Sequence, residues 1–194
     1  MVDQRYNEIQ DIIQDWREYV RSVRICTFSA KPQNMLAWEK YGGAHSGMAL
    51  KFRGSDHDDS DFNSPEKVMY KDVRPEITTL KQQLNAIATV GNDDHQEGSP
   101  AKLLQKAPHL KEEQEWRCFR TQKTDKQTNP VTWFEDVHFE TEDLAAVYFG
   151  AYMDEKAKEV LLRLLQSRYR RTRVFQASLV TGKYELEFER INHQ

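Results

Sequence analysis

The sequence predicts an α+β fold: one domain over residues 1–194, with a mixed or largely antiparallel sheet, packed helices and a C-terminal β-hairpin. Three observations lead to this prediction. Segments with the two-residue alternation of strands are interspersed with segments that have the three- and four-residue spacing of helices. The last two alternating segments flank Thr181-Gly182, which suits a hairpin with a two-residue loop. A chain of 194 residues also fits one domain that buries its own core.

The first half of the chain contains a helix, a strand, a short helix and a second strand. Apolar residues at three- and four-residue steps predict an amphipathic helix over residues 3–21, and the core of the domain follows it over residues 23–191. β-branched and aromatic residues predict a strand over residues 23–29. A helix over residues 35–41 ends at a glycine pair, and the alternating residues 47–52 predict the next strand.

The second half of the chain supplies the remaining elements. Asp154 is positioned to cap the longest helix, whose apolar stripe consists of Ala157, Val160, Leu161, Leu164 and Leu165. The elements predicted after residue 53 are a short strand at 68–70, a helix at 76–90, strands at 113–120, 131–139 and 144–149, a helix at 154–169, and hairpin strands at 173–180 and 183–191.

Composition excludes several classes of protein. Charged residues make up 30% of the chain and the formal net charge is -3, whereas a nucleic-acid-binding domain usually carries a basic stripe. No apolar run approaches the roughly 18 residues of a membrane span, and charges recur over residues 3–24, where a signal peptide would be apolar. We therefore expect a cytoplasmic protein without a membrane segment or a strong nucleic-acid signal; a homo-oligomer and a partner protein both stay open.

The sequence offers no metal site. Cys26 and Cys118 lie far apart, each inside a predicted strand, so they provide neither closely spaced zinc ligands nor good ground for a disulfide, and we expect buried, reduced thiols. The acidic loop 53–65 has alternating carboxylates. However, Ser64 and Tyr70 stand where a calcium-binding EF-hand loop requires glycine and glutamate. We interpret this loop as solvated.

The strand that begins at Glu113 carries the most informative polar residues. Alternation places Glu113, Glu115 and Arg117 on one side and directs Trp116 and Cys118 toward the core. Two carboxylates on one face repel each other unless a cation or a ligand compensates their charge. A structural ion pair between Glu115 and Arg117 is the alternative interpretation of the same pattern.

A second group of polar and aromatic side chains follows the first predicted strand. Ser29 ends that strand, and Trp38 and Tyr41 share one face of the next helix because they are three residues apart. His45 lies in a glycine-rich turn and titrates near neutral pH, so it is a candidate acid or base. In structural terms Ser29 would cap the helix that starts near Asn34, and the aromatic residues would belong to the core.

Four blocks of the sequence resemble a bacterial family catalogued as domain of unknown function 2971. They are CTFSAKPQNMLAWEKYGGAHSGMALKF, VMYKDVRPEI, KAPHLKEEQEWRCFR and LAAVYFGAYMDEKAKEVLLRLL. The first is similar to the family pattern Cys-Phe-Ser, Asn-x-x-x-Trp-x-x-Tyr, His-x-Gly, and the third to its Lys, Glu-x-Glu, Arg signature. The chain departs from the family in starting after an N-terminal segment with an Asn-Asp-Pro-Phe turn, and in having Leu110 in place of an aromatic residue.

Short motifs in the same blocks are similar to those of ADP-ribosyltransferases, which bind NAD in a split sheet. Such enzymes carry a serine on one strand and Glu-x-Glu on a later one, where a glutamate stabilises the charge that develops on the ribose. This resemblance implies an ADP-ribosyltransferase-like enzyme that uses NAD, or a toxin or defence factor. It assigns catalysis to Glu115 and Glu113. The resemblance assigns ligand binding to Ser29 and to Trp38 or Tyr41, and His45 and Arg117 are further candidates from the sequence pattern.

A non-catalytic function is the alternative from a different class. The chain would then be a binding or regulatory module that completes its sheet with a partner chain. An enzyme predicts that Ser29 and Glu115 converge in one concave pocket beside an aromatic residue. A binding module predicts that Glu115 and Arg117 compensate each other without a cleft.

Overall fold

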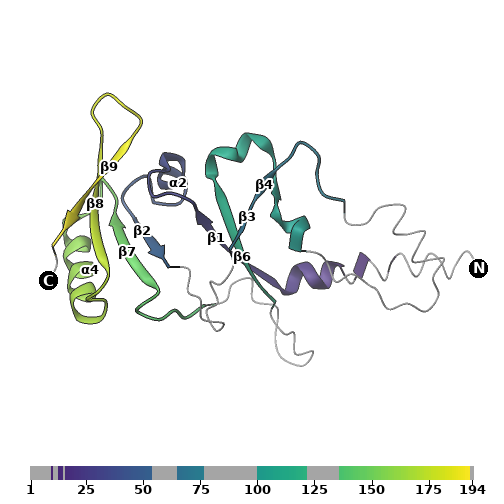
Figure 1. The fold of residues 1–194 in the computed structure, drawn as a ribbon, viewed down its shortest axis with the longest axis horizontal. Helices are drawn as coiled ribbons and strands as arrows, with labels where there is room; N and C mark the ends of the chain where they lie inside the picture. Colours follow the sequence, from purple (N-terminus) through teal and green to yellow (C-terminus); the bar gives the residue numbers. More distant parts are fainter. Residues whose placement is uncertain are drawn as a thin grey trace, which may run out of the picture.

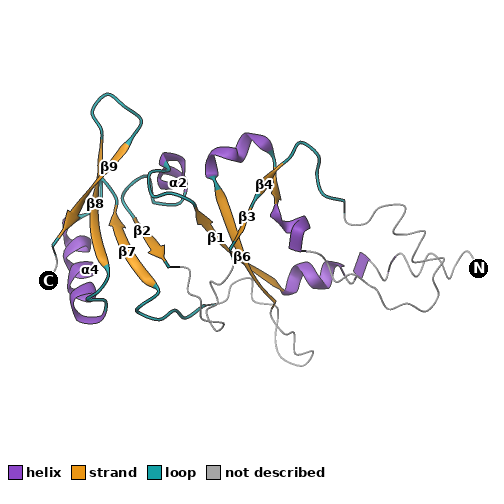
Figure 2. Cartoon of the chain, viewed as in Figure 1, coloured by secondary structure: helices purple, strands orange, loops and turns teal. Residues whose placement is uncertain are grey.

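The chain folds into an α+β structure, as the sequence predicts (Figures 1 and 2). Its strands form a three-stranded sheet of order β1-β6-β3, a four-stranded sheet of order β2-β7-β8-β9, and the pair of β4 (Met69–Tyr70) with β5 (Gln105–Lys106). Figure 1 shows α2 between the two larger sheets and α4 beside the four-stranded sheet. The computed structural model describes residues 10, 13–14, 16–53, 65–76, 100–121 and 136–192.

Several predicted elements lie partly or wholly outside the described residues. Residues 16–22 are helical, in agreement with the N-terminal helix, but most of residues 3–15 are not described. Most of the acidic loop and nearly all of the helix predicted at 76–90 are also outside. Residues 136–139, at the end of a predicted strand, have no regular structure; Phe139 packs edge-to-face on Phe52 instead, with ring centroids 5.0 Å apart.

The three-stranded sheet is antiparallel throughout and aligns two of the predicted site residues. Its strands are β1 (Val23–Ser29), β6 (Glu115–Thr121) and β3 (Glu66–Lys67). β1 has the predicted bounds, whereas β6 begins two residues later than predicted because Gln114 has a left-handed φ of 47° and ends the 3-10 helix η2 (Pro108–Glu113). In the β1–β6 register, Ser29 is directly opposite Glu115.

The four-stranded sheet holds most of the core. It contains β2 (Met48–Phe52), β7 (Leu144–Phe149), β8 (Arg173–Leu179) and β9 (Leu186–Ile191), with β7 and β8 parallel and the other pairs antiparallel. Every residue of β7 is buried, as predicted. Tyr148 packs with Trp38 of α2 on one face of this strand, and Phe149 packs with Leu165 of α4 on the other. The central strand is therefore covered on both faces.

The helix α4 (Glu155–Arg168) begins where the sequence predicts but presents a different face to the core. Asp154 caps it, since its Oδ1 accepts a hydrogen bond from the Ala157 amide at 3.1 Å. Leu161, Leu162 and Leu165 pack toward the sheet, whereas Val160 and Leu164 of the predicted stripe are exposed. The apolar arc of this helix is wider than its contact with the sheet, so only part of it is buried.

The C-terminal hairpin is formed by β8 and β9, with a longer connection than predicted. Leu179 pairs with Leu186, so the strand after the turn begins three residues later than the sequence predicts. The turn itself is at the predicted position: the Lys183 amide bonds to the Val180 carbonyl at 3.1 Å, and Gly182 has a φ of 76°. Glycine is suited to this position because it lacks the Cβ that disfavours positive φ.

The short helix α2 (Met35–Lys40) is anchored to the residues that precede it. The Asn34 side chain accepts a hydrogen bond from the Ala37 amide at 3.2 Å, and the Trp38 Nε1 donates to the Pro32 carbonyl at 2.7 Å. The glycine pair follows α2 as predicted, and Gly43 has a φ of 58°. Among the helices of the described ranges, none combines the length and apolar character needed to cross a membrane.

Candidate functional site

A cavity of about 870 Å³ lies where the end of β1, the helix α2 and the strand β2 meet. Ser29 and Glu115 both line it, as do Glu113 and Lys106. This volume is in the range of small-molecule sites, which are mostly apolar with a few placed polar groups. The aromatic side chains around the cavity are Phe28, Trp38, Tyr41, Phe52, Trp116 and Tyr148.

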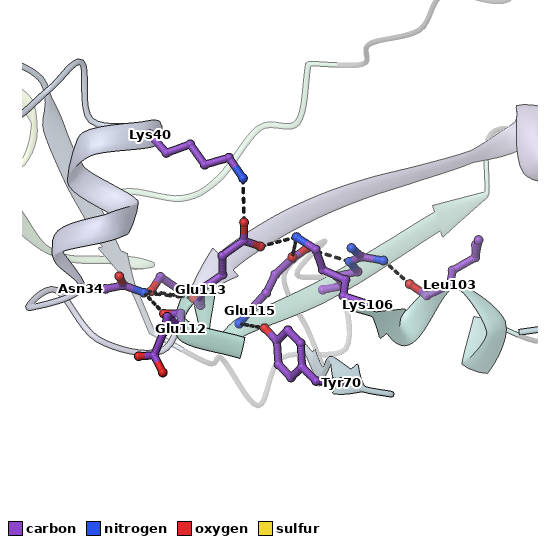
Figure 3. A network of polar contacts seen from close by, with 10 residues as sticks. Asn34, Lys40, Tyr70, Leu103, Lys106, Glu112, Glu113 and Glu115 are labelled. Carbon is purple, nitrogen blue, oxygen red and sulfur yellow. Dashed lines mark hydrogen bonds and ion pairs between the residues drawn. The ribbon is translucent and has the colours of Figure 1, made fainter. Parts of the chain in front are cut away.

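Ser29 is held at the cavity by hydrogen bonds from neighbouring elements. Its hydroxyl donates to the Glu113 carbonyl at 3.4 Å and accepts from the Asn34 side-chain amide at 3.2 Å. That amide also donates to the carbonyls of Glu112 and Glu113 at 2.9 and 3.0 Å. Asn34 therefore both caps α2 and connects the start of that helix to η2 (Figure 3).

The two carboxylates converge on one lysine. The Lys106 ammonium contacts the Glu113 carboxylate and lies 2.8 Å from Glu115 Oε2. Figure 3 shows Lys106 directed toward both glutamates. Glu113 also binds Lys40 Nζ at 2.7 Å, and Glu115 binds Arg117 Nε at 2.7 Å. Both glutamates are buried, so their charges are compensated inside the protein and only slightly by solvent.

The ion pairs keep both glutamates ionised. Burial alone would raise the pKa of Glu113, but hydrogen bonds from Lys106 and Lys40 outweigh it and hold this pKa below its usual value of 4.5. Burial likewise opposes ionisation of Glu115, and hydrogen bonds from Arg117 and Lys106 bring its pKa below the usual value too. Burial would lower the pKa of Lys106, but the two carboxylates raise it. The cluster is therefore charged at neutral pH.

Acid is expected to destabilise the protein through this cluster. Because the pKa values of Glu113 and Glu115 are lower in the folded state than their usual value of 4.5, the contribution of the ionised carboxylates is complete above that pH and is lost as the pH falls through the folded-state values. A Glu113→Gln, Glu115→Gln double variant should show a shallower fall in Tm than wild type from about pH 6 to about pH 3. The measurement is thermal unfolding at each pH, with Glu112→Gln as the control. If Tm fell equally with pH for wild type and the double variant, this account would be contradicted.

The two carboxylates come together from two different elements, whereas the sequence predicted them on one face of a single strand. Glu113 is not on β6 but at the end of η2, and Gln114 turns the chain between it and Glu115. The Tyr70 hydroxyl accepts a hydrogen bond from the Glu115 amide at 3.0 Å. β4 (Met69–Tyr70) pairs in parallel with β5 (Gln105–Lys106), so that Tyr70 is the register partner of Lys106.

Lys106, Lys40, Asn34 and Tyr70 belong to the site although the sequence reasoning did not assign them to it. Signals for two of them were present. Lys106 is the lysine of the Lys, Glu-x-Glu, Arg block, and Asn34 is the asparagine of the Asn-x-x-x-Trp pattern. Neither Lys40 nor Tyr70 had a comparable signal, because their roles depend on contacts between distant segments.

The predicted aromatic residues take different places at the cavity. Trp38 is only 3% exposed and forms an inner wall, whereas Tyr41 is 68% exposed and lies at the rim. His45 is buried behind Trp38, with stacked rings whose centroids are 6.2 Å apart, and it does not line the cavity. Its Nδ1 makes no hydrogen bond to the described residues.

Arg117 also lies outside the cavity lining. Its guanidinium binds Glu115 and donates to the Leu103 carbonyl, so it positions the carboxylate from behind. The structure thus brings Ser29, Trp38 and Tyr41 to the cavity together with Glu113 and Glu115. Among the described residues, no group of three or more His, Cys, Asp or Glu is arranged to hold a metal ion.

The family model described as Protein of unknown function (DUF2971) matches residues 37–118. This range includes Trp38, Glu113 and Glu115, while Ser29 precedes it. The resemblance to this family that the sequence indicates is therefore confirmed over these residues. No curated protein and no solved structure matches the chain.

Proposed function

Because residues 37–118 match the model of the DUF2971 family, whose description assigns no function, we propose from the geometry of the cavity that the protein is an ADP-ribosyltransferase-like enzyme that uses NAD. One observation supports this proposal above all. Ser29 and Glu115 are register partners in β1 and β6, and they line one cavity together with aromatic side chains. This is the convergence that the enzyme hypothesis requires.

The roles follow from the chemistry of NAD. In this reaction the bond between the ribose C1′ and the nicotinamide nitrogen breaks, its electron pair neutralises the nicotinamide, and an acceptor nucleophile forms a bond to C1′ and loses its proton to solvent. Positive charge develops on the ribose as the first bond weakens. Glu115, ionised and fixed by Lys106 and Arg117, is the group that stabilises this charge. Ser29 binds the adjacent part of the ligand.

The remaining walls of the cavity suit the rest of a dinucleotide. Trp38 and Tyr41 provide aromatic surface for a flat ring. Lys31, Lys51 and Arg53 also line the cavity and are exposed. Cationic side chains of this kind bind phosphate oxygens through charge-assisted hydrogen bonds. The cavity therefore has carboxylates for the reacting end and cations for the pyrophosphate.

Incubation with labelled NAD and cell extract tests this function. Wild-type protein should release nicotinamide and transfer label, and Glu115→Gln should lower both rates by about 10²–10³-fold, the typical loss when one electrostatic contact to a transition state is removed. The control is Glu112→Gln, which alters an exposed carboxylate three residues away. Thermal unfolding shows whether each variant is folded. No nicotinamide release by wild type, or equal rates for wild type and Glu115→Gln, would contradict the proposal.

A second function is favoured by the completeness of the ion pairs. Each carboxylate oxygen of Glu113 and Glu115 already contacts a lysine or an arginine. Such a cluster also fits a binding module in which these residues only hold η2, β5 and β6 together. Under this alternative, wild-type protein releases no nicotinamide, and Glu115→Gln differs from it only in the free energy of unfolding.

A further inference from the structure

The two cysteines of the chain face each other across the strands β1 and β6. Cys26 and Cys118 are register partners in this antiparallel pair, although many residues separate them in the sequence. Directly opposite residues of antiparallel strands project from the same face, with Cα atoms about 4.5–5.5 Å apart. Disulfides bridge Cα atoms that are about 4.4–6.8 Å apart. The backbone therefore already has the spacing of a disulfide.

This cysteine pair lies on the face of the sheet opposite to Ser29 and Glu115. Side chains alternate along a strand, so Cys26 and Cys118 share a face with the neighbouring pair Phe28 and Trp116. Ser29 and Glu115 project from the other face. A covalent bond between the cysteines would thus join the two strands that carry the site without placing an atom in contact with the carboxylates.

The two thiols differ in their access to solvent. Cys26 is exposed, whereas Cys118 is buried. An oxidant in solution therefore reaches Cys26 first, and Cys118 is the thiol beside it that can react next. Cys26 is therefore the cysteine that the oxidant reaches, and Cys118 is in the position of a resolving cysteine.

We propose that Cys26 and Cys118 form a reversible intramolecular disulfide when the protein meets a peroxide. The Cys26 sulfur attacks one peroxide oxygen, the O–O bond breaks, and Cys26 becomes a sulfenic acid while water leaves. The Cys118 sulfur then attacks the Cys26 sulfur, the S–S bond forms, and the S–O bond breaks to release a second water. Two thiols are oxidised, and one hydrogen peroxide is reduced to two waters.

The environment of the thiols sets the pH dependence of this reaction. Burial raises the pKa of Cys26, and burial together with the neighbouring Cys26 raises the pKa of Cys118 above its usual value of 9.0. The thiolate is the reactive form, so oxidation is slow at neutral pH and becomes faster as the pH rises. Once formed, the bond closes a long loop between residues 26 and 118, which stabilises the fold by restricting the unfolded chain.

The test exposes the whole protein to hydrogen peroxide and counts thiols in denaturant without reductant. Wild type should fall from two thiols to none as a monomer, yield a cross-linked peptide that contains Cys26 and Cys118, show a higher Tm, and regain both thiols with dithiothreitol. The rates should increase from neutral to alkaline pH. Cys26→Ser changes the exposed partner and should retain its single thiol under the same conditions.

Three results would overturn the proposal. The first is wild type that keeps two thiols after exposure. The second is thiol loss that dithiothreitol does not reverse, which indicates oxidation beyond the sulfenic acid. The third is thiol loss only through disulfide-linked dimers. The peptide map of wild type answers the question even if the Cys26→Ser variant does not fold.

Discussion

Replacement of Lys106 by methionine is expected to lower the free energy of unfolding by about 3–5 kcal/mol, the usual cost of leaving a buried charge without its partner. The Lys106 ammonium is the one contact that Glu113 and Glu115 share among the ion pairs of the described residues. Without it the two buried carboxylates face each other with less compensation. Urea denaturation should show a lower midpoint with an unchanged m value.

A matched lysine variant distinguishes this effect from a general loss of charge. Lys183 is exposed and lies 3.8 Å from Glu185 in a surface ion pair, so Lys183→Met should change the free energy of unfolding by less than about 1 kcal/mol. Adding Glu113→Gln to Lys106→Met should restore part of the lost stability, because one of the uncompensated carboxylates is then neutral. Equal effects of Lys106→Met and Lys183→Met would show that the carboxylate cluster does not depend on Lys106.

The Gly150→Ala substitution should destabilise the fold by about 3 kcal/mol, at the upper end of overpacking effects. A Cβ on Gly150 would lie 2.1 Å from the His45 carbonyl oxygen and 2.8 Å from the Gly47 carbonyl oxygen. Both are backbone atoms, so the clash requires the turn behind Trp38 to move. For a chain of this length the expected decrease in Tm is about 6–12 °C.

Gly182→Ala is the control for the Gly150 variant. Gly182 has a φ of 76°, and a Cβ there would meet no atom within 4 Å. The cost is then only that of a positive φ in an L-residue, about 1–2 kcal/mol. If Gly182→Ala were as destabilising as Gly150→Ala, the close approach of Gly150 to His45 would not be the cause.

The sequence was informative where a segment's structure depends on its own residues. The β-branched run gives β1 its predicted bounds, and the continuous apolar run of β7 predicts its burial. Asp154 marks the start of α4 for the same local reason. The prediction of the buried face of α4 was wrong because the apolar residues cover a wide arc of the helix. The neighbouring sheet decides which part of that arc is buried. Such a choice is made by tertiary packing.

The site was partly predictable for a similar reason. Ser29 and Glu115 were expected to converge from their motifs, and the β1–β6 register places them opposite each other. Lys106 was not expected in the site because its position depends on the pairing of β4 with β5. The opposition of Cys26 and Cys118 depends on the same β1–β6 register. The pattern of each strand indicates which side chains share a face, but it does not indicate which residue of a distant strand is directly opposite.

Calorimetric titration with NAD tests the central claim most directly, since the claim is that Glu115 and Ser29 bind one ligand in a shared cavity. Wild-type protein should bind NAD saturably. Glu115→Gln should weaken binding by about tenfold or more, equivalent to about 1.4 kcal/mol, whereas Glu112→Gln should bind as wild type does. An absence of binding by wild type, or the same Kd for wild type and Glu115→Gln, would contradict the claim.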